Sequence, residues 1–98
     1  MNIEFDDRLV VVTGGAQGIG QATASGFKAA GARVHLLDID SDGVEAAAAE
    51  IGTGCSTVDL GDQEAVADCI QEIEAAHGPV DILASSAGGV RGQIGRPI

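Results

Sequence analysis

The chain has 98 residues, enough for one small domain with a modest core, and we expect a single domain over residues 1–98. Apolar residues make up 45% of it, which is typical of a globular protein, and no apolar run reaches the length of a membrane span. Fifteen acidic against five basic residues give a formal net charge of −10, which argues against nucleic acid and anionic membranes as partners.

The N-terminal residues 1–7 are acidic and lack the apolar centre of a signal peptide, so we expect a cytoplasmic protein. The two cysteines, Cys55 and Cys69, do not have metal-type spacing. We interpret them as small buried side chains in a reducing compartment, in preference to a disulfide or a metal site.

Strand-like and helix-like segments alternate along the chain. We predict strands over about 8–13, 32–38, 55–58 and 80–85, and helices over about 17–30, 43–51 and 63–76. Ser41 or Asp42 is expected to cap the second helix and Asp62 the third, and glycines end all three. The faces expected to be buried are Ile19, Ala22, Thr23, Gly26, Phe27 and Ala30 in the first helix, and Val66, Cys69, Ile70 and Ile73 in the third.

This order predicts a β-α-β-α-β-α-β chain. Right-handed crossovers between successive strands then give an α/β fold of the Rossmann type, a partial doubly wound parallel sheet with helices on both faces.

A glycine-rich turn joins the first predicted strand to the first helix. Gly14, Gly18 and Gly20 have the spacing G-x-x-x-G-x-G. A pyrophosphate at a helix N-terminus needs a backbone without an obstructing Cβ, and such a turn needs positive φ. Because the glycines follow a strand and open a helix, we predict nucleotide binding here in preference to a purely structural turn.

Asp38 ends the second predicted strand. A carboxylate at this place accepts hydrogen bonds from the ribose hydroxyls of an adenosine and repels a 2′-phosphate. Ile39 follows in place of Arg or Lys, and Asp40 adds negative charge. We therefore predict NAD in preference to NADP. A role of Asp38 in capping the next helix is compatible with this prediction.

The other candidate residues lie at the ends of the third and fourth predicted strands. Asp59 either meets the adenine amino group, with Leu60 packed nearby, or serves only the entry to the next helix. Ser85, Ala87 and Gly88 are small and leave room for a ligand. Neither His35 nor His77 is placed to activate a serine, so we predict no nucleophilic serine.

These residues resemble the classical short-chain dehydrogenase/reductase family. Thr13 to Gly20 match its T-G-x-x-x-G-I-G signature, Asp38 is similar to its NAD-selecting acid, and residues 80–88 look like its fourth strand, with Ser85 and Ser86 where the family usually has two Asn. The resemblance covers about residues 7–89 and implies a dinucleotide site formed by Gly14, Gln17, Gly18, Ile19, Gly20, Asp38, Asp59, Leu60, Ser85, Ala87 and Gly88.

The resemblance implies an oxidoreductase that moves hydride between NAD(H) and an alcohol or ketone. The family's catalytic Ser and Tyr-x-x-x-Lys have no counterpart here, since the sequence has no Tyr and Lys28 is its only Lys. We therefore expect the cofactor-binding half of such an enzyme, a fragment without activity alone. The alternative is an autonomous nucleotide-binding or self-assembling module, a homo-oligomer paired through the fourth strand. The substrate is not specified by these residues.

Overall fold

The computed structural model describes residues 7–16 and 18–85. Within them, strands and helices alternate as predicted, with bounds that differ by a few residues at the ends. The elements are β1 (Leu9–Thr13), α1 (Gly18–Ala29), β2 (Arg33–Asp38), α2 (Ser41–Ile51), β3 (Gly54–Thr57), α3 (Gln63–His77) and β4 (Ile82–Ser85).

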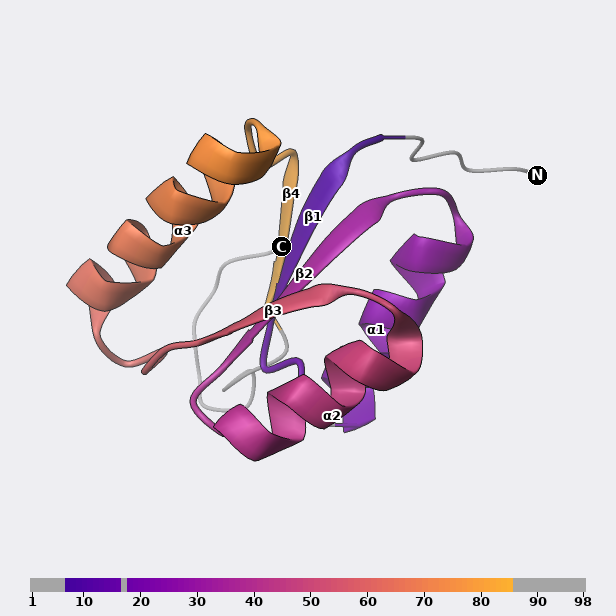
Figure 1. The fold of residues 1–98 in the computed structure, drawn as a ribbon, viewed down its shortest axis with the longest axis horizontal. Helices are drawn as coiled ribbons and strands as arrows, with labels where there is room; N and C mark the ends of the chain where they lie inside the picture. The colour runs from indigo at the N-terminus through magenta and orange to yellow at the C-terminus, as the bar shows by residue number, and fades with distance from the viewer. Residues whose placement is uncertain (1–6, 17, 86–98) are drawn as a thin grey trace.

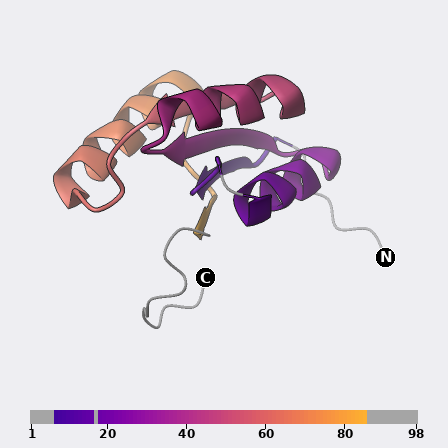
Figure 2. The ribbon, with the colours of Figure 1, turned by 90° about the horizontal axis from the view of Figure 1, so that it is seen from below.

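The strands form one parallel sheet in the order β3-β2-β1-β4. Figure 1 shows the sheet between α3 on one side and α1 and α2 on the other. The view turned by 90° also separates α3 from α1 across the strands (Figure 2). The predicted doubly wound α/β fold is therefore confirmed, with helices on both faces of the sheet.

The core has two layers, one on each face of the sheet. All five residues of β1 are buried, as expected for a strand covered by helices on both faces, which needs apolar side chains at every position. Alternate residues serve opposite layers. The layer under α1 and α2 includes Val10, Val12, Leu36, Val44 and Ala48. The layer under α3 consists of Leu9, Val11, Leu37, Val58 and Ile73, with Val66 and Cys69 packed against it.

The predicted buried face of α1 is wrong in part. Ile19 is 74% exposed, Ala22 and Gly26 are exposed as well, and the buried residues of the helix are Gly20 and Ala24. The helix turns its smallest side chains to the sheet, so its backbone approaches β1 and β2 closely. Ile19, one position before Gly20, is thereby rotated outward.

The N-cap of α2 is also corrected. Asp40, and neither Ser41 nor Asp42, has the extended backbone of a cap, and its Oδ1 accepts a hydrogen bond from the N–H of Gly43 at 3.0 Å. The helix therefore starts two residues earlier than predicted. The cap of α3 is Asp62, as predicted.

The two cysteines are free and pack on opposite faces of the sheet, Cys55 with the layer under α1 and α2 and Cys69 with the layer under α3. The sheet between them rules out the disulfide considered from the sequence. Burial, with a smaller effect of Glu45, raises the pKa of the Cys55 thiol. Over the described ranges, no helix is long and apolar enough to cross a membrane.

Candidate functional site

The glycine-rich turn lies at the carboxyl edge of the sheet. The strand register places Thr13, the last residue of β1, between Leu37 of β2 and Ser85 of β4. The chain order reverses here, because β2 and β3 extend the sheet on one side of β1 and β4 on the other. Open α/β sheets bind ligands at the carboxyl ends of strands at such a reversal.

Two of the glycines shape the turn itself. Gly14 has a φ of 77°, which favours glycine. Its N–H and that of Gly15 both donate to the carbonyl oxygen of Leu37, at 2.8 and 3.2 Å. A Cβ on Gly15 would lie 2.8 Å from the Cβ of Leu36. These residues therefore attach the turn to β2, and their N–H groups are already bonded within the protein.

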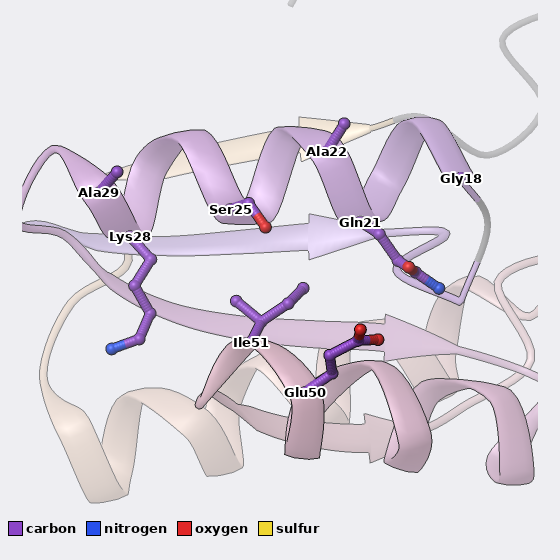
Figure 3. Close-up of a pocket in the computed structure, with 8 residues that line it drawn as sticks. All are labelled: Gly18, Gln21, Ala22, Ser25, Lys28, Ala29, Glu50 and Ile51. Atoms are coloured by element: carbon purple, nitrogen blue, oxygen red, sulfur yellow. The ribbon is translucent and has the colours of Figure 1, made fainter.

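Gly18 and Gly20 occupy different surroundings. Gly18 begins α1, and a Cβ placed on it would have no neighbour within 4 Å. Gly20 is buried against the sheet. Figure 3 shows Gly18 at the start of the helix with Gln21 close by, and Gln21 Nε2 donates to the carbonyl oxygen of Ala16 at 3.1 Å.

The first N–H groups of α1 have no acceptor within the helix, as at any helix start. Because the space where a Cβ of Gly18 would lie is open, a pyrophosphate can approach these N–H groups and accept hydrogen bonds from them. Ile19, next in the chain after Gly18, is exposed.

Asp38 joins the glycine turn to the start of α2. The residue is 5% exposed. Oδ2 accepts the N–H of Ala16 at 2.9 Å and Oδ1 accepts the N–H of Asp40 at 3.1 Å. A carboxylate oxygen accepts two hydrogen bonds, so each oxygen of Asp38 can accept one more. Two such positions, side by side, match the paired hydroxyls of a ribose.

Charge is divided between the two edges of the sheet. Asp40 and Asp42 accompany Asp38 at the carboxyl edge. In the described part of the chain, every Lys and Arg lies at the other edge: Arg8 precedes β1, Lys28 ends α1 and Arg33 begins β2. A 2′-phosphate beside Asp38 would therefore meet carboxylates and no described cation.

The remaining candidates are less closely grouped. Asp59 is exposed, and its Oδ1 accepts the N–H of Gly61 at 2.9 Å, which is the turn-forming role considered as its alternative. Leu60 packs half-buried against the layer under α3. Ser85 ends β4 beside Thr13. Gln17, Ala87 and Gly88 lie outside the described residues.

Both histidines are remote from Ser85. His35 lies near the start of β2, where its Nε2 is 2.8 Å from Ser56 Oγ. Its ring centroid is 6.1 Å from that of His77, at the end of α3. Burial, and to a lesser extent His77, lowers the pKa of His35. These contacts hold His35 between β3 and the end of α3.

The sequence did not reveal the contacts that join Asp38 and the start of α2 to the glycine turn. Ala16 supplies the N–H that Asp38 holds, and a Cβ on Gly43 would lie 3.0 Å from the Cβ of Ala16. The first turn of α2 thus packs directly against the glycine turn. The spacing Asp40-x-x-Gly43 was the available signal for the cap of α2, since an N-cap Asp accepts the N–H of the residue three positions later.

Comparisons with known proteins identify the family of the chain. The family described as short chain dehydrogenase matches residues 8–96. The D-threitol dehydrogenase of Mycolicibacterium smegmatis is 37% identical over 93% of the chain and 38% of its own length. The 2-dehydro-3-deoxy-L-rhamnonate dehydrogenase (NAD(+)) of a Sphingomonas species is 43% identical over 86% of the chain and 34% of its own length.

Solved structures show the same likeness. A short-chain type dehydrogenase/reductase from Mycobacterium ulcerans superposes with a TM-score of 0.83 at 29% identity, covering 89% of this chain and 34% of that one. The 3-ketoacyl-(acyl-carrier-protein) reductase from Brucella melitensis, complexed with NADH, superposes with a TM-score of 0.76 at 28% identity. The match covers 82% of this chain and 34% of the reductase chain.

The chain spans about a third of the length of the curated relatives it matches. The family match extends over nearly all of the sequence, and the parallel sheet with its glycine turn is the fold of the solved relatives. The chain therefore belongs to the short-chain dehydrogenase family.

Proposed function

We propose that this chain binds NAD in preference to NADP at the carboxyl edge of its sheet. In this role it is the cofactor-holding part of an oxidoreductase acting on an alcohol or ketone. One observation carries the proposal: Asp38 is buried, both of its oxygens are positioned by backbone N–H groups, and one acceptor position remains on each. Family membership and a relative named for NAD(+) support the cofactor class.

Each part of the site would hold one part of the cofactor. The start of α1 would hold the pyrophosphate through its N–H groups, and the absence of a Cβ on Gly18 leaves room for it. Asp38 would hold the adenosine ribose. When bound, the nicotinamide exchanges hydride with the substrate carbon. By holding the adenosine and pyrophosphate ends, the chain would orient the ring.

The proton transfer that accompanies hydride transfer needs an acid–base group. The family uses a Tyr with a Lys four residues later, whereas this sequence has no Tyr. Its one Lys, Lys28, lines a cavity with the first residues of β1 and β2, at the edge opposite the glycine turn. The proposal therefore assigns cofactor binding to these 98 residues and predicts no dehydrogenase activity for the chain alone.

Calorimetric titration of the chain with NAD and with NADP tests the proposal. We expect NAD to bind more tightly. Asp38→Asn keeps an oxygen for the Ala16 N–H and removes the charge, so it should weaken NAD binding about tenfold, as for the loss of a charge-assisted hydrogen bond. The affinity for NADP should rise relative to that for NAD, because the 2′-phosphate of NADP is no longer repelled by a carboxylate.

Asp59→Asn is the matched control, because Asp59 is exposed and follows β3, the strand next to β2. The ratio of NAD affinity to NADP affinity in this variant should equal that of the original chain. An unchanged ratio in the Asp38→Asn chain would contradict the assigned role of Asp38.

A second function, self-assembly through β4, is favoured by a separate observation. In the described sheet β4 is an edge strand, and its Leu83 is 45% exposed. An edge strand with an exposed apolar side chain pairs readily with another strand. We include a homo-oligomer formed through β4 as the alternative.

A further inference from the structure

A separate cavity of about 360 Å³ opens at the amino edge of the sheet, a volume within the range of small-molecule sites. It is lined by the first residues of β1, β2 and β3, by the ends of α1 and α3, and by the α2–β3 turn. We call it the amino-edge cavity. The glycine turn lies at the opposite ends of these strands, so the two sites do not share residues.

The lining of the amino-edge cavity is basic, although the protein is acidic. Lys28, Arg33, His35 and His77 line it, and no Asp or Glu does, although the sequence has fifteen acidic and five basic residues. Among the Lys, Arg and His side chains of residues 7–16 and 18–85, only Arg8 lies outside it. Lys28 and Arg33 carry positive charge, and the two imidazoles add polar ring nitrogens, a combination that favours an anionic ligand.

A helix end accounts for the placement of Arg33, whose Nη1 donates to the carbonyl oxygen of His77 at the end of α3, but not for that of Lys28. The C-termini of helices attract positive charge, but the N–H groups of Gly31, Gly52 and Gly78 already donate to carbonyl oxygens in the last turns of α1, α2 and α3. The side-chain ammonium of Lys28 makes no hydrogen bond or ion pair with any residue that the structure describes. Its ammonium group is therefore available to a ligand.

Two acids near this edge, Asp81 and Glu74, are directed to other partners. Asp81 accepts the N–H of Leu9 at 2.8 Å and lies 3.8 Å from Arg8. Glu74 accepts the N–H of Val80 at 2.9 Å. Neither carboxylate lines the cavity, so neither competes there for the cations.

Two glycines let basic side chains of the cavity lie close to the backbone. A Cβ on Gly52 would lie 3.3 Å from Lys28 Cε, and a Cβ on Gly54 would lie 2.9 Å from His35 Nδ1. Larger residues at these positions would press on Lys28 and His35. Figure 3, a close-up of a neighbouring pocket that Lys28 lines together with Glu50, shows Lys28 extending from α1 at the end of the helix remote from Gly18.

Arg33 gives the cavity a fixed positive wall. Its Nη1 donates to the carbonyl oxygen of His77 at 2.7 Å, and its Nε and Nη2 donate to the carbonyl oxygen of Asp7 at 3.2 and 3.0 Å. These bonds hold the guanidinium in place between Asp7 and the end of α3. No carboxylate of the described residues forms an ion pair with it. A guanidinium has five N–H groups, so donors remain for a ligand.

We propose that the amino-edge cavity is an oxyanion site that takes the phosphate or carboxylate group of a small metabolite. The Lys28 ammonium supplies the principal charge. Arg33, His35 and His77 supply further N–H donors, and Gly52 and Gly54 leave room for the Lys28 and His35 side chains.

An NMR titration tests this site. The isotopically labelled 98-residue chain is titrated with inorganic phosphate and, separately, with acetate, while its backbone amide signals are followed. We expect saturable shifts at Gly52, Thr53 and Gly54. Tighter binding of phosphate identifies a phosphate group as the preferred ligand, and tighter binding of acetate a carboxylate. Phosphate bound at the glycine turn would shift Gly18 and Ile19 instead, so this result is independent of the dinucleotide proposal.

Lys28→Gln should weaken the binding responsible for the shifts at Gly52 to Gly54 about tenfold, through loss of a charge-assisted contact. Arg8→Gln removes the same charge outside the cavity and should leave this affinity unchanged. The absence of saturable shifts at Gly52 to Gly54, or equal affinity in the original and Lys28→Gln chains, would overturn the proposal.

Discussion

At the residue scale, the glycines of one signature differ in what they do. Gly14 and Gly15 attach the turn to β2 through the carbonyl oxygen of Leu37. Gly20 packs against the sheet. Only Gly18 combines an exposed position with open space where a Cβ would be. Spacing alone could not separate these roles, because it does not show which neighbour each glycine faces.

This difference predicts opposite outcomes for two similar substitutions. Gly15→Ala places a Cβ against the fully buried Leu36 and should lower the free energy of unfolding by about 1–3 kcal/mol through overpacking. Gly18→Ala should leave the unfolding free energy unchanged or slightly higher, while weakening NAD binding because a methyl group occupies the phosphate approach. Urea unfolding and NAD calorimetry on both variants distinguish these outcomes. Equal losses of stability would contradict the separation of roles.

At the element scale, the start of α2 depends on a residue that the helix pattern did not indicate. Asp40 lies immediately after Asp38 and Ile39, and its neighbour Ser41 was an equally reasonable cap from sequence. The backbone decides between them, because only Asp40 has the extended conformation, with φ −84° and ψ 94°, that lets its side chain reach the N–H of Gly43.

Asp40→Ala should therefore lower the free energy of unfolding by about 1 kcal/mol, the usual cost of losing a cap. Ser41→Ala is the matched control, and it should change stability little because Ser41 is exposed inside the first turn. Urea unfolding of both variants measures the difference. A larger loss in Ser41→Ala would show that the cap is assigned to the wrong residue.

The packing of α3 against β2 predicts a dependence of stability on pH. Burial, and secondarily His77, lowers the pKa of His35 below its usual 6.5, so the unfolded chain binds this proton more readily than the folded chain. The unfolding free energy should fall as pH decreases from about 6.5 towards the lower pKa of the folded state, and recover as pH rises.

His35→Gln keeps a polar group near Ser56 and removes the titration. It should reduce the loss of stability between about pH 7 and about pH 5, as measured by urea unfolding at several pH values. An unchanged slope would contradict a contribution from His35.

At the scale of the whole molecule, the sheet separates two kinds of surface. Its carboxyl edge carries the glycine turn with Asp38, and its amino edge carries the basic cavity around Lys28 and Arg33. The sequence predicts the first grouping through its resemblance to a known family. The second is not visible in the linear sequence, where Arg33 and Asp38 belong to the same short strand. The two edges are separate because parallel strands all point the same way.

Self-association through β4 belongs to this scale as well. Leu83→Lys places a charge on the exposed face of the edge strand and should reduce dimer or higher oligomer formation, since edge lysines oppose strand pairing. Ile39→Lys alters an exposed apolar residue at the end of β2 and should leave association unchanged. Sedimentation at increasing protein concentration measures both. A stable monomer of the original chain at high concentration would exclude this alternative.

The sequence by itself determined the order of strands and helices, the Rossmann-type fold and the position of the glycine turn. These follow from apolar runs, helical periodicity and glycine at helix ends, which act within a few residues. Only the tertiary structure decided which face of α1 is buried, that Asp38 holds the N–H of Ala16, and that Lys28, Arg33, His35 and His77 line one cavity. The physical reason is that these contacts join residues far apart in the chain, and their partners exist only after the sheet has assembled.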